Sequence, residues 1–133
     1  MQNHEAWIKI AEEDLAAAKA LLRSELLSPS VYHSHQAAEK SLKAFLIFKK
    51  YSLVKTHDLV QLIELSMKLD KEFEKIVDEA DQLNPFSTKF RYPSEFDIPD
   101  HADAALAIKQ AQKIMKFVCK KILKLNTGQI SFL

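Results

Sequence analysis

The sequence predicts an all-α fold, an up-and-down bundle of four to five helices. In several segments apolar residues recur at alternating spacings of three and four, which places them on one face of a helix. Glycine occurs once in 133 residues, as Gly128, so primed β-turns and glycine-rich phosphate loops have almost nothing to form from. A chain of this length fits one domain, which we expect to span residues 1–126, with residues 127–133 as a C-terminal tail.

The first two helices are expected between residues 3 and 51. Asn3 can act as the N-cap of a helix over residues 3–27, whose apolar stripe consists of Ile8, Ala11, Leu15, Ala18 and Leu22. Ser28-Pro29 has the pattern of an N-cap followed by proline at the first helical position, which predicts a second helix to about Tyr51. That helix is apolar over most of its circumference, which is typical of a central helix or of one covered by a second subunit.

We expect a homodimer in solution because this second helix is apolar on more sides than one small bundle would cover. A specific interface would bury about 1,600 Å² in total. Sedimentation of the protein at tens of micromolar measures this, and a monomer as the sole species would contradict it.

Two further helices are expected before residue 90. Thr56 can cap the third helix, with Asp58 in its first turn, and Asp70 can cap the fourth. Asn84-Pro85 repeats the pattern of a cap followed by proline, which predicts that the fourth helix breaks there.

The last helix has the clearest pattern. Asp100 is expected to cap it, after a loop bracketed by Pro93 and Pro99, and Asn126 and Gly128 are expected to end it. Apolar residues hold three-four spacing for about six turns. They are Ala104, Ile108, Ala111, Met115, Val118, Ile122 and Leu125.

Composition limits the classes of partner. The net charge is +1, so a nucleic-acid partner would have to be recognised by a local patch. The one cysteine, Cys119, cannot form an internal disulfide, which suits the cytoplasm where we expect the protein. The N-terminal residues are charged too early for a signal peptide, and no apolar run approaches the roughly 18 residues of a membrane helix. We therefore expect no membrane partner.

The segment HSHQAAEKSLKAF, residues 33–45, holds the most informative polar residues. His35 and Glu39 lie one turn apart on the face expected to be buried, and Lys43 lies one turn further. A buried, unpaired carboxylate costs several kcal/mol, so Glu39 must be paired or must titrate. Its partner would be Lys43, His35 or an arginine from another helix. This constellation is either a structural polar network or a pocket that binds a ligand or a phosphate.

Arg91 and His57 are two further candidates. Arg91, in the segment KFRYP, is one of two arginines, and its planar guanidinium suits a carboxylate or a phosphate. It either pairs with Glu39 or contacts the phosphate of RNA or a nucleotide. His57 stands at the expected start of the third helix, where it either belongs to the cap or acts as a neutral base or donor.

The last helix carries a line of lysines opposite its apolar stripe, namely Lys109, Lys113, Lys116, Lys120 and Lys124. This lysine ridge is either a solvated face or a surface for RNA or an acidic protein. We expect no metal and no cofactor. There is no Cys-x-x-Cys and no Glu-x-x-His pair, and His33 and His35 point to different sides of a helix.

Taken together, these segments resemble the HEPN family of small helical bundles. The resemblance implies a four-to-five-helix bundle that dimerises, and a genomic association with minimal nucleotidyltransferases, often as a toxin–antitoxin-like pair. It covers about residues 5–125. It is carried by Trp7, Ala11 and Asp14-Leu15, by residues 35–44 (HQAAEKSLKA), by His57-Asp58-Leu59 and by Arg91-Tyr92-Pro93.

The family resemblance also implies a possible activity, because many HEPN proteins are metal-independent ribonucleases. Their motif is an arginine, four to six residues of any kind, and a histidine. In this chain nine residues separate Arg91 from His101, and nine separate Arg23 from His33, so the motif is absent.

We therefore predict a homodimeric partner of a nucleotidyltransferase-like protein that binds nucleotide or RNA phosphate through Lys43, His57 and Arg91 without efficient catalysis. A ribonuclease toxin using Arg91 and His101 is the first alternative. A purely structural interaction module is the second.

Overall fold

A computed structural model describes the backbone of residues 3–87 and 98–130 and the side chains of residues 3–86 and 98–126. This part of the chain is helical and contains no strand, which confirms the all-α prediction. The elements are α1 (His4–Arg23), α2 (Leu27–Phe48), α3 (Leu59–Leu69), the 3₁₀ helix η1 (Lys71–Ile76), α4 (Val77–Leu83), the 3₁₀ helix η2 (Asn84–Ser87) and α5 (His101–Ile130).

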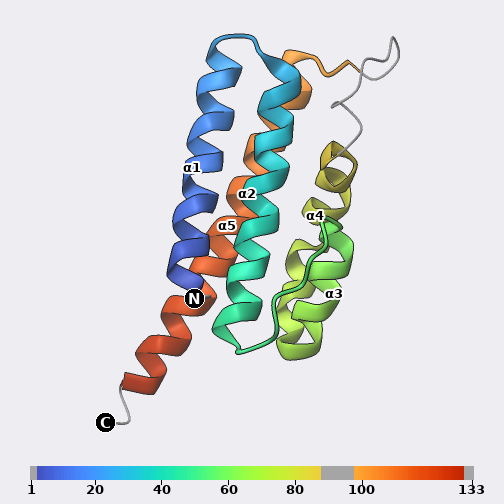
Figure 1. Cartoon of the computed structure of the whole chain (residues 1–133). Coiled ribbons are helices and arrows are strands. Elements are labelled where there is room, and N and C mark those ends of the chain that lie inside the picture. The colour runs from blue at the N-terminus through green and yellow to red at the C-terminus, as the bar shows by residue number, and fades with distance from the viewer. Residues whose placement is uncertain (1–2, 88–97, 131–133) are drawn as a thin grey trace.

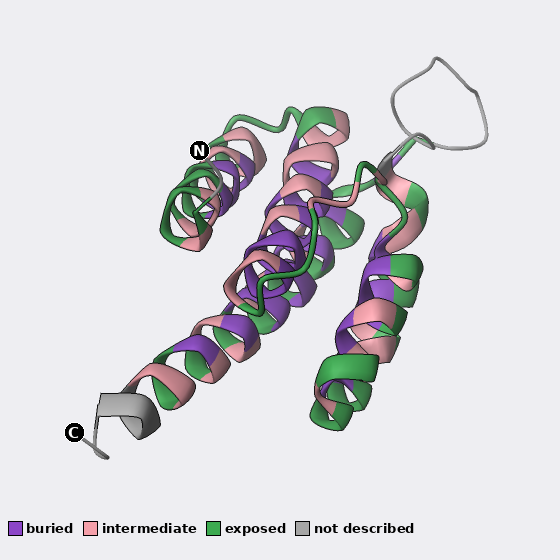
Figure 2. Ribbon diagram, turned by 60° about the horizontal axis from the view of Figure 1, so that its bottom comes forward, coloured by how far each residue is buried: buried purple, intermediate pink, exposed green. Residues whose placement is uncertain are grey.

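Helix α2 is the centre of the bundle (Figures 1 and 2). It packs against α1 on one side, against α5 behind it, and against α3 on the other side. One chain therefore covers the broad apolar surface of α2, which confirms that α2 is a central helix. The apolar surface of α2 is therefore no longer a reason to expect a second subunit, and dimer formation stays a prediction for sedimentation.

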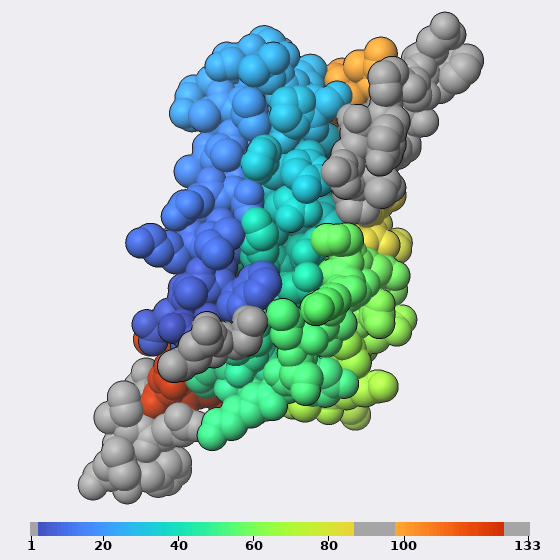
Figure 3. Space-filling model, in the orientation of Figure 1, coloured from blue at the N-terminus to red at the C-terminus, as the bar shows by residue number. Residues whose placement is uncertain are grey.

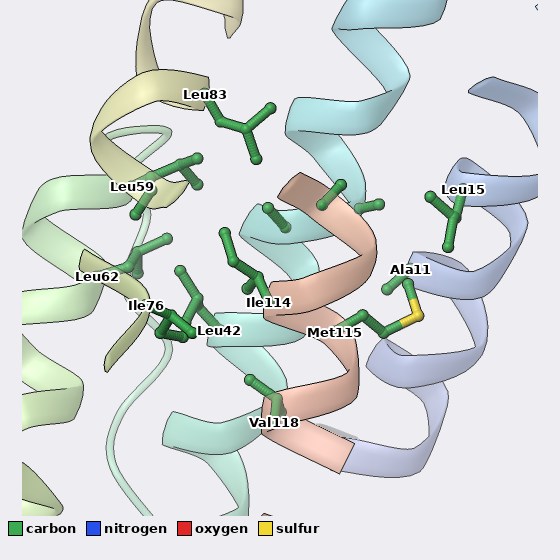
Figure 4. Packing of buried hydrophobic residues seen from close by; sticks show 14 of the residues in the cluster. Ala11, Leu15, Leu42, Leu59, Leu62, Ile76, Leu83, Ile114, Met115 and Val118 are labelled. Carbon is green, nitrogen blue, oxygen red and sulfur yellow. The ribbon is translucent and has the colours of Figure 1, made fainter. Parts of the chain in front are cut away.

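The hydrophobic core lies on both sides of the α2–α5 pair. In Figure 4, Met115 of α5 points toward Ala11 of α1, and Leu42 of α2 lies beside Ile76 of η1. Leu42 and Ile76 are almost completely buried. Burial of one such side chain contributes about 1.5–3 kcal/mol, so packing rather than local propensity supplies most of the stability of these helices.

The connection between α1 and α2 differs from the expectation. Asn3 caps α1 as predicted, since its side chain accepts a hydrogen bond from the Ala6 N–H. Ser28 does not cap α2, because the helix already begins at Leu27. Glu25 adopts a left-handed conformation with φ of 59° and reverses the chain within a few residues. Pro29 therefore lies within the first turn of α2, where backbone N–H groups have no helical partner in any case.

Helix α3 is capped by Asp58, not by Thr56. The Asp58 carboxylate accepts from the backbone N–H groups of the first turn, while Thr56 accepts from the Asp58 N–H. Asn84 fixes this cap from a distance, since its amide donates to Asp58 at 3.0 Å and accepts from the Leu59 N–H at 2.7 Å. The predicted break at Asn84-Pro85 is present, because α4 ends at Leu83 and η2 follows.

The last third of the chain follows the expected caps but not the expected end. Asp70 accepts from the Glu72 N–H and caps η1, so the fourth segment begins as a 3₁₀ helix. The Asp100 carboxylate accepts a hydrogen bond from the Asp103 N–H, and the Asp103 carboxylate accepts one from the Asp100 N–H. The first of these bonds confirms Asp100 as the cap of α5. The predicted end at Asn126 and Gly128 is wrong, because α5 continues to Ile130. One glycine costs a helix only about 1 kcal/mol.

Candidate functional site

The Glu39 carboxylate is the centre of a buried polar cluster. Glu39 is only 3% exposed, yet both of its oxygens have basic partners. Oε2 accepts from Lys43 Nζ at 2.9 Å, one helical turn along α2. Oε1 lies 3.0 Å from His57 Nδ1. The segment after α2 runs back along the bundle before α3 begins (Figure 1), and the contact with Glu39 places His57 beside α2.

Lys43 is held from two sides. Its ammonium group bonds Glu39 and lies 5.9 Å from the centroid of the Trp7 ring on α1, within the range of a cation–π contact. An ammonium group has three N–H donors, and Glu39 takes one of them. Lys43 therefore keeps donors for another acceptor, although its side chain is nearly buried.

His35 belongs to the core rather than to the cationic cluster. Its side chain is completely buried, and neither ring nitrogen has a hydrogen-bond partner in the described part of the chain. Its Nδ1 lies 3.9 Å from Glu39 Oε1. Burial lowers the pKa of His35 to about 4, although the Glu39 carboxylate and the His57 backbone act in the opposite direction. His35 is therefore neutral near pH 7.

A second carboxylate, Asp14 of α1, holds two more basic side chains of α2. Asp14 Oδ1 lies 2.9 Å from His33 Nδ1, and Asp14 Oδ2 accepts from Lys40 Nζ at 2.6 Å. Sequence reasoning missed this cluster. The available signal was the position of Asp14, which falls between Ala11 and Ala18 on the apolar stripe of α1 and is accordingly buried.

The two clusters form one surface, which we call the α2 basic face and define as His33, Lys40, Lys43 and His57. On α2 its members are spaced seven and three residues apart, so they lie on one side of the helix. Figure 3 shows the surface of α2 between α1 and the segment that leads to α3. Each histidine uses Nδ1 on a carboxylate, and its Nε2 makes no hydrogen bond to the described residues. His57 is 75% exposed.

His101 does not join this surface. It starts α5, and its Nδ1 lies 3.0 Å from Glu25 Oε1 in the connection between α1 and α2. Glu39 is twelve residues into α2 from Leu27, about 18 Å along the helix axis. His101 is thus at the end of the bundle, away from Lys43 and His57. Arg91 lies outside the described residues, as does Pro93.

The described residues do not provide a metal site or a membrane helix. They contain no group of three or more His, Cys, Asp or Glu side chains placed to hold a metal ion. Among the same residues, no helix combines the length and the apolar character that a membrane crossing requires. What the described geometry offers is two ammonium groups and two imidazole rings set on two buried carboxylates, and the remaining N–H donors of the ammonium groups can bind an anion.

Comparisons with known proteins agree with this architecture. A family model described as the HEPN domain matches residues 4–122. A curated protein of Methanocaldococcus jannaschii, "Putative toxin MJ1304", is 28% identical over 137 residues, which is 92% of this chain and 89% of that protein. TT1696 from Thermus thermophilus shares the fold, with a TM-score of 0.79 and 24% identity over 91% of this chain and 99% of its own. ST0689, described as an archaeal HEPN homologue, has a TM-score of 0.77 and 26% identity over 92% and 99%.

Proposed function

Because the chain belongs to the HEPN family, we propose that it binds the phosphate of a nucleotide or RNA on the α2 basic face and does not cleave RNA efficiently. The observation that carries the proposal is the Glu39 carboxylate, which holds Lys43 and His57 side by side from two separate segments. We further propose that the protein is cytoplasmic and pairs with a nucleotidyltransferase-like protein. The family resemblance and the toxin name of the archaeal relative support such a pair.

The chemistry of binding follows from the unused donors. Glu39 and Asp14 fix the positions of Lys43 and Lys40, so less side-chain entropy is lost when a phosphate arrives. The His57 side chain is 75% exposed, and its imidazolium form, with an N–H on both ring nitrogens, can donate from Nε2 to a phosphate while Nδ1 donates to Glu39. Charge-assisted hydrogen bonds from such groups to phosphate oxygens are about twice as strong as neutral ones, and salt weakens them.

The same geometry argues against efficient cleavage. General acid–base cleavage of RNA needs two groups within about 3 Å of the 2′-hydroxyl and of the leaving oxygen. His33 precedes Glu39 by six residues, about 9 Å along α2, so it and His57 do not meet at one phosphodiester. His101 pairs with Glu25 at the end of the bundle.

His57→Gln is expected to weaken binding of AMP by about ten- to hundredfold at low salt, because one charge-assisted hydrogen bond is worth about 1.5–3 kcal/mol. Titration calorimetry at about 50 mM salt, where phosphate contacts are only weakly screened, measures this. His101→Gln is the matched control, since His101 is also an exposed histidine bonded through Nδ1 to a glutamate at 3.0 Å. It should leave the affinity unchanged. Equal affinities of the His57 variant and the wild type would contradict the proposal and favour the structural module.

A ribonuclease toxin is the second candidate, and the toxin name of the relative favours it. If the protein is a ribonuclease toxin, it should cleave RNA in the presence of EDTA. This cleavage should disappear in both Arg91→Ala and His101→Ala. If the protein binds phosphate without efficient cleavage, the purified protein with EDTA should leave RNA intact and should still bind AMP. Robust cleavage with that dependence would replace the binding proposal by the ribonuclease.

A further inference from the structure

A groove of about 470 Å³ lies between η1 and α5. It is lined by Glu72, Lys75, Phe117, Lys120, Lys121 and Lys124. The α2 basic face, in contrast, lies beside α1 and the segment before α3. The groove is therefore a different surface, and a ligand bound there would be separate from the one in the proposed function.

The charges in the groove are only partly balanced. Lys121 bonds Asp70 at 2.9 Å and also Glu72, and Lys75 bonds Glu72 at 3.1 Å. Hydrogen bonds from Lys121 and Lys75 lower the pKa of Glu72 to about 2, so Glu72 stays charged and engaged with them. Lys120 and Lys124 are exposed and have no ion pair within the described residues. The groove keeps an uncompensated positive charge at these two lysines.

The lysine ridge extends this charge along α5. Lys113 donates to Glu79 of α4 at 2.7 Å, and among the described residues it is the one member of the ridge with an acidic partner. Lys116 is exposed and, in the part of the chain described, makes no ion pair, like Lys120 and Lys124. These three lie one helical turn apart, with neighbouring Cβ atoms about 5–6 Å from each other. That interval is comparable with the spacing of successive phosphates on a nucleic-acid strand.

Phe117 gives the groove a rigid aromatic surface. Its ring packs edge-to-face on the buried ring of Phe73, with centroids 5.0 Å apart and planes at 77°. Lys121 Nζ lies over the face of the Phe117 ring, 5.8 Å from its centroid, so a base that stacks on this face shares it with the ammonium group or displaces that group. The core thus holds the ring in place, while part of it faces the groove between the lysines. A lysine-lined groove with an aromatic floor suits a strand that carries both phosphates and flat bases. An acidic peptide would use the lysines but not the ring.

We propose that the groove between η1 and α5 binds single-stranded nucleic acid, with phosphates on Lys120 and Lys124 and a base stacked on Phe117. The shared chemistry of phosphodiester and base makes RNA and DNA equivalent for this surface. Lys116 continues the track for the next phosphate along α5. Lys75 and Lys121 border the strand while Glu72 holds them in position.

The test uses fluorescence anisotropy with labelled ten-nucleotide oligo-U and oligo-dT. Lys120→Gln/Lys124→Gln should raise Kd about tenfold and reduce the slope of log Kd against log salt by about 1.4, which is two single-strand phosphate contacts. Lys9→Gln/Lys68→Gln removes the same charge from exposed lysines of α1 and α3 and should change Kd less than twofold. Phe117→Leu should raise Kd about tenfold, and Phe117→Tyr should restore it. Thermal melts confirm that each variant is folded.

Three results would overturn the proposal. The first is a Kd of the Lys120/Lys124 variant equal to that of its control. The second is displacement of the oligonucleotide by poly-glutamate at equal charge concentration with no effect of Phe117→Leu, which would identify an acidic protein as the partner. The third is a preference above tenfold for RNA or for DNA. Since Lys120→Gln/Lys124→Gln should leave AMP binding at the α2 basic face unchanged, failure here and failure of the proposed function are distinguishable.

Discussion

Glu39→Ala is expected to lower the free energy of unfolding by about 3–5 kcal/mol, because it leaves the ammonium group of Lys43 buried without its counter-charge. Lys43 is 7% exposed and bonds Glu39 at 2.9 Å. His57 contributes less to this loss, since it is mostly exposed and can bond water instead. Urea denaturation at pH 7 measures the effect.

Two variants make the Glu39 experiment specific. Glu13→Ala removes an exposed glutamate of α1 and should change stability by no more than about 0.5 kcal/mol. Glu39→Met/Lys43→Met removes both charges and keeps the volume, so it should recover most of the loss. A loss below about 1 kcal/mol for Glu39→Ala, or a double variant as unstable as the single one, would contradict the assignment of Glu39 as a buried charge partner.

His35 is expected to make the protein about 3 kcal/mol less stable at pH 4 than at pH 6.5. The folded protein keeps this imidazole neutral down to a pKa of about 4, whereas the unfolded chain takes up the proton near 6.5. As pH falls through this window the unfolded state binds more protons, so stability falls. The contribution of neutral His35 to the free energy of unfolding is present at pH values above 6.5. It is lost as the pH falls to the folded pKa of about 4.

The variant that isolates this effect is His35→Leu, followed by urea denaturation between pH 4 and pH 7. Every other titratable group is present in both proteins, so the difference in pH slope belongs to His35 and to the charges that face it, Glu39, His57 and Asp58. His101→Leu replaces an exposed histidine and should keep the wild-type slope. Identical slopes for His35→Leu and the wild type would show that His35 is not buried neutral.

The helices were predictable because their signal is local. Three-four apolar spacing reports the buried face of a helix wherever it packs, and the caps at Asn3, Asp70 and Asp100 depend on backbone N–H groups within three residues. The errors have a non-local cause. Asp58 replaces Thr56 as the cap of α3 partly because Asn84, 26 residues away, bonds it.

In the polar clusters around Glu39 and Asp14, too, the contact within one helix was predictable and the contacts between segments were not. The bond between Glu39 and Lys43 follows from their spacing of four on one helix. The approach of His57 depends on the path of the segment between α2 and α3, which no local pattern specifies. The cluster of Asp14 with His33 and Lys40 depends on the register of α1 against α2. Periodicity identifies which faces are buried, but not which positions on two helices meet.

The packing of α2 against α5 has a consequence for synthesis on the ribosome. Helix α5, a main partner of α2, is synthesised after the other described helices, and 52 residues separate the end of α2 at Phe48 from the start of α5 at His101. At 5–20 residues per second this interval lasts about 3–10 seconds. During that time α1 and α2 can already pair, but the side of α2 that α5 will cover remains in water. The nascent chain therefore exposes an apolar surface of α2 until α5 has been synthesised.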